Sequence, residues 1–415
     1  MTTKKSISTS LIFLLIIVVL FLSFTSLYKD NKPNKAKSFR VRISFAGDIM
    51  VHTPQYEAAF NEKKGEYNFN ENYREIKKYI KLSDLAICNL ETVIGNEPYS
   101  GFPRFNSPKA LCTALKKAGF HMTVNANNHS LDQGIMGILD TVKTCRKSGL
   151  KTSGCRLDNE ERFTIVKVKG VNIGIVAYTY ERPSKENLHN LNKIPMDDKA
   201  LYSINSFRYK KLPYKEVDSE LIKIKTTIND AKKAGADIVV TVLHWGREYR
   251  RTPEPVQQYI SKELTRFGTD VIFGSHPHVT RPMEFIPKKY HPNATHNVPV
   301  FYSMGNFISD QREERLHNRF IEQGGIAYAD IVIKNLPIEK NKKPSKKIIK
   351  VTPHIMPVWT DKYITKSGRN KYVIVPLNDA PEKSPALKAS GHLSSAQRAK
   401  KDAVEQFGED LFILK

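Results

Sequence analysis

Short apolar runs alternate along this chain with longer amphipathic stretches, and this alternation limits the possible folds more than any other feature. Apolar runs of strand length lie at 40–46, 85–89, 121–126, 171–178, 236–244, 270–274 and 298–304. Helical periodicity occupies the gaps at 73–81, 108–118, 134–148, 217–234 and 254–267. Strands that alternate with helices predict an α/β fold.

Polar residues follow directly after the apolar runs. They fall in the segments FAGDIMVH (45–52), CNLETVIG (88–95), NANNHSLDQG (125–134), LHWGREY (243–249), FGSHPHV (273–279) and YSMGNFISDQ (302–311). Ligands of open α/β sheets bind beyond the carboxyl ends of the strands. The sequence therefore predicts a binding site built from these segments.

The polar residues are of the types that bind divalent metals, which favour carboxylate oxygen, amide oxygen and neutral imidazole. Taken singly, Asp48 is also typical of a turn and Glu91 of a surface, while His244 is also typical of a core histidine. The HxH of 276–278 is a stronger signal, because Pro277 favours a loop that turns both histidines inward. The candidate ligands are Asp48, Glu91, Asn128, His244, His276 and His278.

The chain carries a formal charge of +24, with 66 Lys and Arg against 42 Asp and Glu. Such a field favours an anionic partner, although a general preference for lysine explains it equally well. We expect no nucleic acid, since the chain has no zinc-finger spacing, RNP signature or glycine-rich phosphate loop. Arg104 and Arg247 are candidates for gripping carboxylates or phosphates, the alternative being that they are solvated in loops.

The segments that flank the alternating region differ from it in composition. Residues 1–10 form a short basic N-terminus, and 11–28 are an apolar stretch that predicts an anchor in the lipid bilayer or an uncleaved signal. A polar linker at 29–38 leads into a folded domain at 39–375, and 376–415 predict a polar tail that is poorly ordered or weakly helical. Basic residues after the apolar stretch would place the body in the cytoplasm by the positive-inside rule.

The motifs GDIM, NLE, FPRFNSP, NNHSLDQG, HWGREY, GSHPHV and SMGNFISDQ follow one another between Val41 and Pro357. In this order the chain resembles the CapA or PgsA-type poly-γ-glutamate capsule synthesis proteins. The resemblance implies a four-layer α/β/β/α sandwich similar to the calcineurin-like metallophosphoesterases, with one or two Mn, Zn or Fe ions. It also implies a single-pass protein of the cytoplasmic membrane with an extracytoplasmic body, working with membrane-embedded capsule synthetase subunits on an anionic polymer.

The resemblance also implies roles for single residues. Asp48 and His278 would bind a first metal, and Glu91 stands where the phosphoesterases keep a bridging aspartate. Asn128, His244 and His276 would bind a second metal. The next residue, His129, would act as a catalytic acid or electrostatic stabiliser. Residues expected to surround and orient the ligands are Asp132, Asn306 and Asp310.

One departure from the phosphoesterase pattern bears on the metal count. The DxH motif is here Asp48, Ile49 and Met50, so one ligand is missing unless His52 reaches the site. A thioether is a poor ligand for a hard cation, so the sequence is compatible with one metal ion as well as with two.

Three functions are compatible with the sequence. The first is a capsule factor that acts on or hands over a poly-γ-glutamate-like polymer, the second is a metal-dependent phosphoesterase, and the third is a non-catalytic scaffold for synthetase partners. The incomplete first motif favours the first and third over the second, and it leaves open whether the chain is a metal-dependent hydrolase.

Overall fold

The computed structural model describes residues 38–182, 189–210, 213–292, 296–336, 346–378 and 381–413. The predicted anchor at 11–28 lies outside them, as do the basic N-terminus and nearly all of the linker. Within the described ranges, no helix combines the length and the apolar character that crossing a membrane requires.

An eight-stranded mixed sheet contains the first strand and the last four strands of the described chain. Its order is β21-β20-β19-β1-β4-β7-β8, and β18 pairs with β1. Strands β1, β4, β7 and β8 are parallel to one another, whereas β19, β20 and β21 are antiparallel. The strands are β1 (Ser38–Ile49), β4 (Leu85–Leu90), β7 (Met122–Val124), β8 (Lys151–Ser153), β18 (Asn306–Ile308), β19 (Gln323–Asn335), β20 (Lys346–Ile364) and β21 (Asn370–Pro376).

A second, seven-stranded sheet has the order β13-β10-β14-β15-β17-β16, and β9 pairs with β10. Strands β10, β14, β15 and β17 are parallel, so their carboxyl ends share one edge. The strands are β9 (Thr164–Val168), β10 (Val171–Tyr180), β13 (Ser206–Phe207), β14 (Ile238–His244), β15 (Val271–Ser275), β16 (Met283–Ile286) and β17 (Val298–Phe301).

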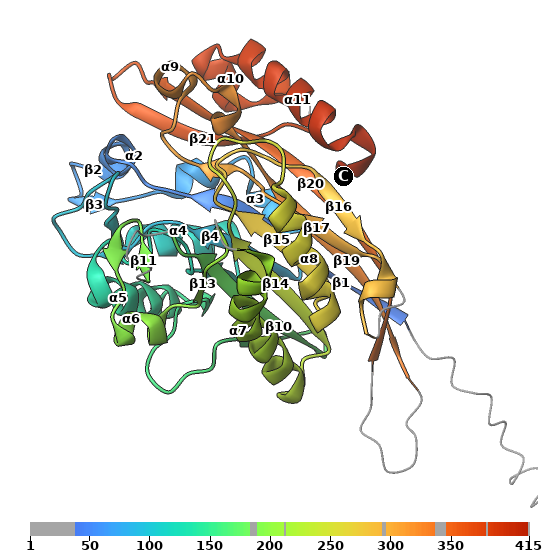
Figure 1. The fold of residues 1–415 in the computed structure, drawn as a ribbon. Helices are drawn as coiled ribbons and strands as arrows, with labels where there is room; N and C mark the ends of the chain where they lie inside the picture. Colours follow the sequence, from blue (N-terminus) through green and yellow to red (C-terminus); the bar gives the residue numbers. More distant parts are fainter. Residues whose placement is uncertain are drawn as a thin grey trace, which may run out of the picture.

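Helices cover the outer faces of the two sheets (Figure 1). The helices are α2 (Thr53–Ala59), α3 (Lys77–Ile80), α4 (Ala110–Ala118), α5 (Gly134–Lys147), α6 (Asp198–Ser203), α7 (Tyr214–Lys233), α8 (Pro255–Phe267), α9 (Glu313–Leu316), α10 (Pro385–Ser390) and α11 (Leu393–Phe407). Short two-residue strands complete the loops: β2 (Phe60–Asn61), β3 (Glu66–Tyr67), β5 (Ile94–Gly95), β6 (Ser107–Pro108), β11 (Asn190–Leu191) and β12 (Ile194–Pro195).

The inner faces of the two sheets pack against each other. Phe45 of β1 stacks on Phe273 of β15 with ring centroids 5.4 Å apart, and Phe273 also stacks on Phe301 of β17. Strand β14 is buried along its whole length, which explains the unbroken apolar run that predicted it. With helices outside both sheets, the layers follow the order helix, sheet, sheet, helix.

The helices follow from local sequence. Helix α7 buries Val217, Leu221, Ile224 and Ile228, a spacing of three and four residues that places them on one face. The helix predicted at 73–81 is the exception, because its residues divide between a 3-10 turn, Asn70–Tyr73, and the short helix α3.

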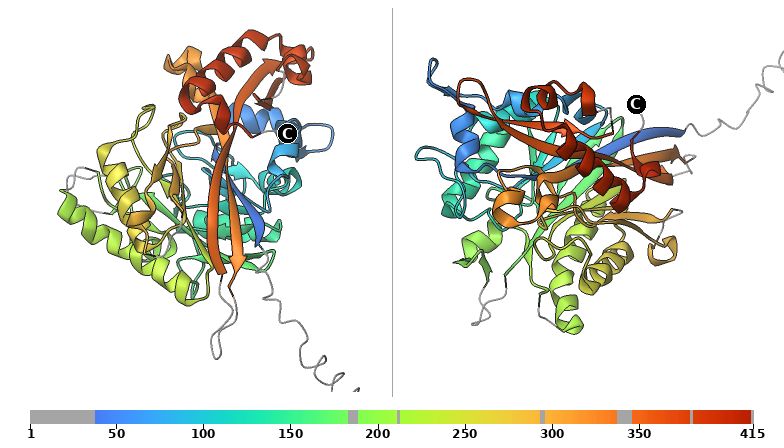
Figure 2. Two further views of the ribbon diagram at one scale, coloured as in Figure 1. Left: turned by 90° about the vertical axis from the view of Figure 1, so that its right-hand side faces the viewer. Right: turned by 90° about the horizontal axis from the view of Figure 1, so that it is seen from above.

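The C-terminal segment differs from the predicted poorly ordered or weakly helical tail. Helices α10 and α11, red in Figure 2, lie beside β20 and β21. Ala386, Leu387, Ala396 and Ala399 are buried there. Their apolar positions are mostly alanines, whose small side chains made the segment look polar. Its ordered residues also reach the core between the sheets through Phe407.

Candidate metal centre

The carboxyl ends of parallel strands from both sheets meet at one point. Asp48 lies near the end of β1, Glu91 directly follows β4, and His244 ends β14. Residues 276–278 follow β15, and 128–129 lie in the loop after β7. The convergence that the strand-end pattern predicted is therefore present in the fold.

Ligand-type atoms lie close together at this point. One such atom from each of Glu91, His276 and His278 lies within 4.8 Å of the other two. The same holds for Asp48, Glu91 and His244, so Glu91 belongs to both groups. All five residues are buried.

Amide side chains hydrogen-bond to members of the group formed by Asp48, Glu91 and His244. Asn89 Nδ2 donates to Asp48 Oδ1 at 2.8 Å and lies 3.2 Å from His244 Nδ1. Asn128 Oδ1 lies 2.6 Å from His244 Nε2, which places the predicted amide ligand beside the predicted imidazole. Asn89 was missed from sequence, although it and Glu91 are two apart on an extended segment and therefore share a face.

The backbone is bent to bring the two histidines of the HxH segment inward. His276 and His278 have φ angles of 96° and 59°, in the left-handed region that non-glycine residues seldom occupy. Such conformations persist where surrounding structure enforces them, and they concentrate at functional sites. The His276 amide donates to both oxygens of Asp48 at 3.3 Å, which fixes this turn against β1.

Glycine allows the first strand to reach the site. Gly47 lies against the segment before β18, where a Cβ at position 47 would collide with the carbonyl oxygen of Gly305. This close approach pairs Asp48 with Asn306 across β1 and β18. Asn306 Oδ1 in turn lies 3.1 Å from His278 Nδ1, so it can orient that imidazole.

Several buried polar atoms of the cluster have no hydrogen-bond partner among the described residues. They are both ring nitrogens of His276, Oε1 of Glu91 and Oδ1 of Asn89. Leaving such atoms unpaired costs about 1–3 kcal/mol each. Imidazole nitrogen and carboxylate oxygen are also the donor types that Mn, Zn and Fe accept, so the residues fit a divalent cation.

The electrostatics suit the same ion. Burial lowers the pKa of His244 to about 3 and that of His276 well below its usual range, so both rings are neutral and able to act as ligands. Burial and the neighbouring Asp48 raise the pKa of Glu91. Burial also acts to raise the pKa of Asp48, but the hydrogen bond and charge of His278 outweigh it and the pKa is lowered.

His129 lies beside the cluster in a defined orientation. Its Nδ1 lies 2.7 Å from Asp132 Oδ2, and its ring packs edge-on against Phe105 with centroids 4.7 Å apart. Asp132 Oδ2 also accepts from the Phe105 amide at 2.7 Å, which holds the carboxylate in place. Asn192, which lies outside the motifs, approaches His129 Nε2 at 3.5 Å.

Two residues considered from sequence lie elsewhere. The carboxylate of Asp310, expected to orient ligands, instead binds Lys362 of β20, Tyr372 of β21 and Arg315 of α9, which face it from three neighbouring elements. His52 Nδ1 contacts Gln55 and the amide of Asp310 at the start of α2. Neither ligand group among the described residues includes His52, so the gap in the first motif is not filled by it.

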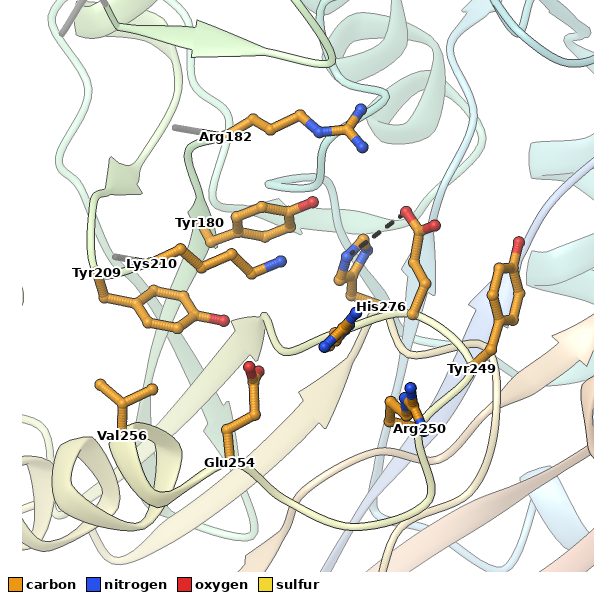
Figure 3. Close-up of a pocket in the computed structure, with 11 residues that line it drawn as sticks. Tyr180, Arg182, Tyr209, Lys210, Tyr249, Arg250, Glu254, Val256 and His276 are labelled. Carbon is orange, nitrogen blue, oxygen red and sulfur yellow. Dashed lines mark ion pairs between the residues drawn. The ribbon is translucent and has the colours of Figure 1, made fainter. Parts of the chain in front are cut away.

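A cavity of about 960 Å³ opens beside His276 (Figure 3). Lys210 extends between Tyr180 and Tyr209 toward the histidine, with its Nζ 3.8 Å from the centroid of the Tyr180 ring. Burial lowers the pKa of Lys210 to about 8. The cavity is lined by Tyr180, Arg182, Tyr209, Lys210, Arg247, Glu248, Tyr249, Arg250, Glu254, Val256 and His276.

Four cations against two carboxylates give this cavity a positive lining. Arg104 and Arg247 were the two candidates for gripping carboxylates or phosphates. Arg247 lines the cavity. Arg104 is exposed on the loop before Phe105 and is not among the lining residues. Arg182 and Lys210 were missed, since they border a Lys-rich stretch that carries no motif.

The fold and site together define the class: a mixed α/β protein whose strand ends enclose a metal-type ligand set beside a basic cavity. The model of one family, described as the bacterial capsule synthesis protein PGA_cap, matches residues 42–311, more than half of the chain. The chain belongs to this family.

Curated relatives agree with that assignment. The capsule biosynthesis protein CapA of Bacillus anthracis is 26% identical, with 83% of this chain and 79% of the relative aligned. The PGA biosynthesis protein CapA of Bacillus subtilis is 27% identical over 74% of each. Among solved structures, the calcineurin-like phosphoesterase YfkN of Bacillus subtilis is similar at 12% identity and a TM-score of 0.40, covering 89% of this chain and 99% of that one.

Proposed function

We propose that this protein is a membrane-anchored factor of poly-γ-glutamate capsule biosynthesis whose divalent-metal centre and basic cavity bind and process the anionic polymer. One observation carries the proposal: a buried set of metal-type ligands opens, through His276, into a cavity lined by four cations. The names of the two CapA relatives support a polymer of this kind.

The polymer fits the cavity chemically. Poly-γ-glutamate carries a carboxylate on every residue, and the arginines at 182, 247 and 250 offer planar donor pairs that match carboxylate geometry. A cavity of about 960 Å³ lies at the upper end of the range of small-molecule sites, which suits a polymer segment better than one residue.

The residues around the metal-type ligands divide the chemical work. A cation held by Asp48, Glu91, His244, His276 and His278 would polarise a carbonyl oxygen of the polymer backbone or grip a carboxylate. His129 is held by Asp132 through Nδ1, which leaves Nε2 available to pass a proton to a leaving group.

The location belongs to the same proposal. Residues 11–28 would anchor the chain in the cytoplasmic membrane, with the body outside, where it would meet synthetase subunits and the emerging polymer. The basic residues after the apolar stretch argue for the opposite orientation. Protease added to intact protoplasts should cleave the body, whereas cleavage only after lysis would place the body inside and overturn this part.

Metal content is the first test. Elemental analysis of the full-length chain in detergent should find Mn, Zn or Fe, and the content should fall at least severalfold in His276→Ala. His392→Gln, which changes a half-exposed histidine near α11, serves as the control and should retain the metal. Equal metal content in His276→Ala and His392→Gln would contradict metal binding at this site.

Polymer output is the second test. In a strain that makes poly-γ-glutamate, His244→Ala should change the amount or chain length of the secreted polymer, with His392→Gln as control. Unchanged polymer in His244→Ala, with the protein present at normal levels, would instead favour a non-catalytic scaffold.

A metal-dependent phosphoesterase is the second candidate. The arrangement of His129 favours this function. His129 lies next to Asn128 and is hydrogen-bonded to Asp132, and an acid that protonates an alkoxide leaving group would be held in the same way. This function predicts hydrolysis of a simple phosphomonoester or phosphodiester with added Mn²⁺ or Zn²⁺, abolished by His129→Ala. Polymer change without such hydrolysis would exclude it.

A further inference from the structure

A second cavity, of about 410 Å³, lies apart from the metal centre and shares no lining residue with the first. It is bounded by β8, by the segment 160–165 that leads into β9, and by Asn205, which precedes β13. Three arginines line it: Arg146, Arg156 and Arg162.

The first of these arginines is already neutralised. Arg146 forms a two-pronged ion pair with Glu160, its Nη1 and Nη2 lying 2.5 and 2.8 Å from the two carboxylate oxygens. Its Nε donates to Thr152 Oγ1 at 3.0 Å. The charge of Arg146 is therefore satisfied within the protein.

The other two arginines converge on one neutral side chain, and the Glu160 carboxylate acts on Arg156 only from beyond ion-pair range. Nη1 of Arg156 and Nη1 of Arg162 donate to the same neutral atom, Asn205 Oδ1, at 2.7 and 3.2 Å. Glu161 also lines the cavity but is exposed, and within the described part of the chain neither guanidinium has a carboxylate in ion-pair range.

Arg156 is buried at this point. Only 4% of its surface is exposed, and its Nε has no hydrogen-bond partner. The Arg156 guanidinium lies over the ring of Tyr202, 4.6 Å from its centroid, and Tyr202 also hydrogen-bonds to it. Burial lowers the pKa of Arg156, and the charge of Arg162 lowers it further.

Two converging cations of this kind are unfavourable by themselves. The buried charge of Arg156 is costly unless it is paired, and the like charge of the exposed Arg162 adds to that cost. An anion between the guanidiniums would reverse the sign of their interaction.

We propose that this cavity is a second, metal-independent anion site in which Arg156 and Arg162 together bind one carboxylate or phosphate group. Guanidinium donors match the oxygen spacing of both groups, so the two share one chemistry. The carboxylate would come from the anionic polymer and the phosphate from solution. The site goes beyond the proposed function, because it requires neither the metal nor the first cavity.

Calorimetric titration of the full-length chain, stripped of metal with EDTA, tests the site. Inorganic phosphate, glutarate and a short poly-γ-glutamate are titrated separately. Arg162→Gln is the main variant, because its exposed side chain can be changed without disturbing the core. Arg156→Lys is the second variant and keeps a positive charge in the buried position.

We expect the metal-free chain to bind at least one of the three anions. Arg162→Gln and Arg156→Lys should each weaken that binding about tenfold or more, because each loses one charged hydrogen bond to the anion. Arg398→Gln, an exposed arginine on α11, should bind as the unaltered chain does.

The three ligands identify the source. Binding of phosphate alone supports the site with phosphate as its ligand, and binding of glutarate or the polymer supports a polymer carboxylate. No binding by the stripped chain, or equal binding by Arg162→Gln and Arg156→Lys, overturns the proposal. Loss of metal or polymer function in His276→Ala would leave this result unaffected.

Discussion

At the scale of single residues, His52 gives a pH dependence that arises outside the two ligand groups. Burial lowers its pKa to about 4 from an ordinary value of 6.5. Because the unfolded chain takes up a proton that the folded chain refuses, the stability that neutral His52 contributes is present above pH 6.5. It is lost as pH falls from 6.5 to 4.

Replacing this histidine should flatten that loss. In His52→Asn, which keeps a residue suited to starting α2, the free energy of unfolding should fall less between pH 7 and pH 4, by up to about 3 kcal/mol. Urea unfolding of the metal-free chain at several pH values measures this difference, with His392→Asn as the control. Parallel curves for His52→Asn and the unaltered chain would contradict the assigned pKa.

Most candidate ligands were predictable because each stands at a strand end. Asp48, Glu91, His244 and the HxH segment need only the alternation of strands and helices to be placed at one edge. Lys210 and Asn192 were not predictable, since they come from a polar stretch whose position over the site is set by tertiary packing. Asp310 was placed wrongly for the same reason, as its partners Lys362 and Tyr372 lie on later strands.

At the scale of elements, one buried arginine holds the loop that carries Arg247 and Arg250. Arg281 Nε donates to the Arg250 carbonyl at 2.7 Å, its Nη2 to the Arg247 carbonyl at 2.8 Å, and its Nη1 to Gln257. Burial lowers the pKa of Arg281 to about 10. These bonds fix the backbone beneath the basic cavity.

Arg281→Met should loosen this loop without emptying the metal centre. The change removes three hydrogen bonds made by a buried guanidinium, and a hydrogen bond to a charged group contributes about 1.5–3 kcal/mol. We expect faster hydrogen exchange at 246–251 and weaker poly-γ-glutamate binding, with metal content retained. Arg281→Lys, which keeps a donor, should be intermediate, and unchanged exchange at 246–251 in Arg281→Met would show that the loop is held by other contacts.

The contrast between the parallel and the antiparallel strands shows what sequence patterns leave out. The parallel strands β4, β10, β14 and β15 are buried and apolar, so they were predicted. The long antiparallel pair β19 and β20 was missed, because β20 mixes lysines, prolines and apolar residues as one face meets solvent. Its prolines at 353 and 357 also weaken any strand prediction.

At the scale of the whole molecule, the C-terminal segment should be required for stability. A chain ending at residue 376 would lose Leu377, Leu387, Phe407, Phe412 and Ile413, all buried. Burying one large apolar side chain contributes about 1.5–3 kcal/mol, and a domain has only about 5–15 kcal/mol in total. We expect this truncation to abolish cooperative thermal unfolding, and removal of 414–415 to have no effect. A truncated chain that unfolds at the original temperature would show that the C-terminal segment is not needed for stability.

Under the proposed function, the charge of the whole chain determines how polymer binding depends on salt. A net charge of +24 attracts a polyanion over many contacts, and salt screens those contacts as the Debye length falls from about 10 Å at 0.1 M to about 3 Å at 1 M. Affinity for poly-γ-glutamate should therefore drop at least about tenfold between 50 and 500 mM NaCl, as polyanion binding by counter-ion release requires. Affinity for glutarate, with only two carboxylates, should change much less.

The double variant Arg247→Gln with Arg250→Gln locates this effect. Removing two cations of the first cavity should weaken polymer binding and also make its logarithmic dependence on salt less steep, since fewer counter-ions are released. Arg398→Gln with Arg74→Gln removes the same charge from exposed ion pairs elsewhere and should leave the slope nearly unchanged. Equal slopes for both double variants would mean that the polymer follows the general surface charge and does not enter the cavity beside His276.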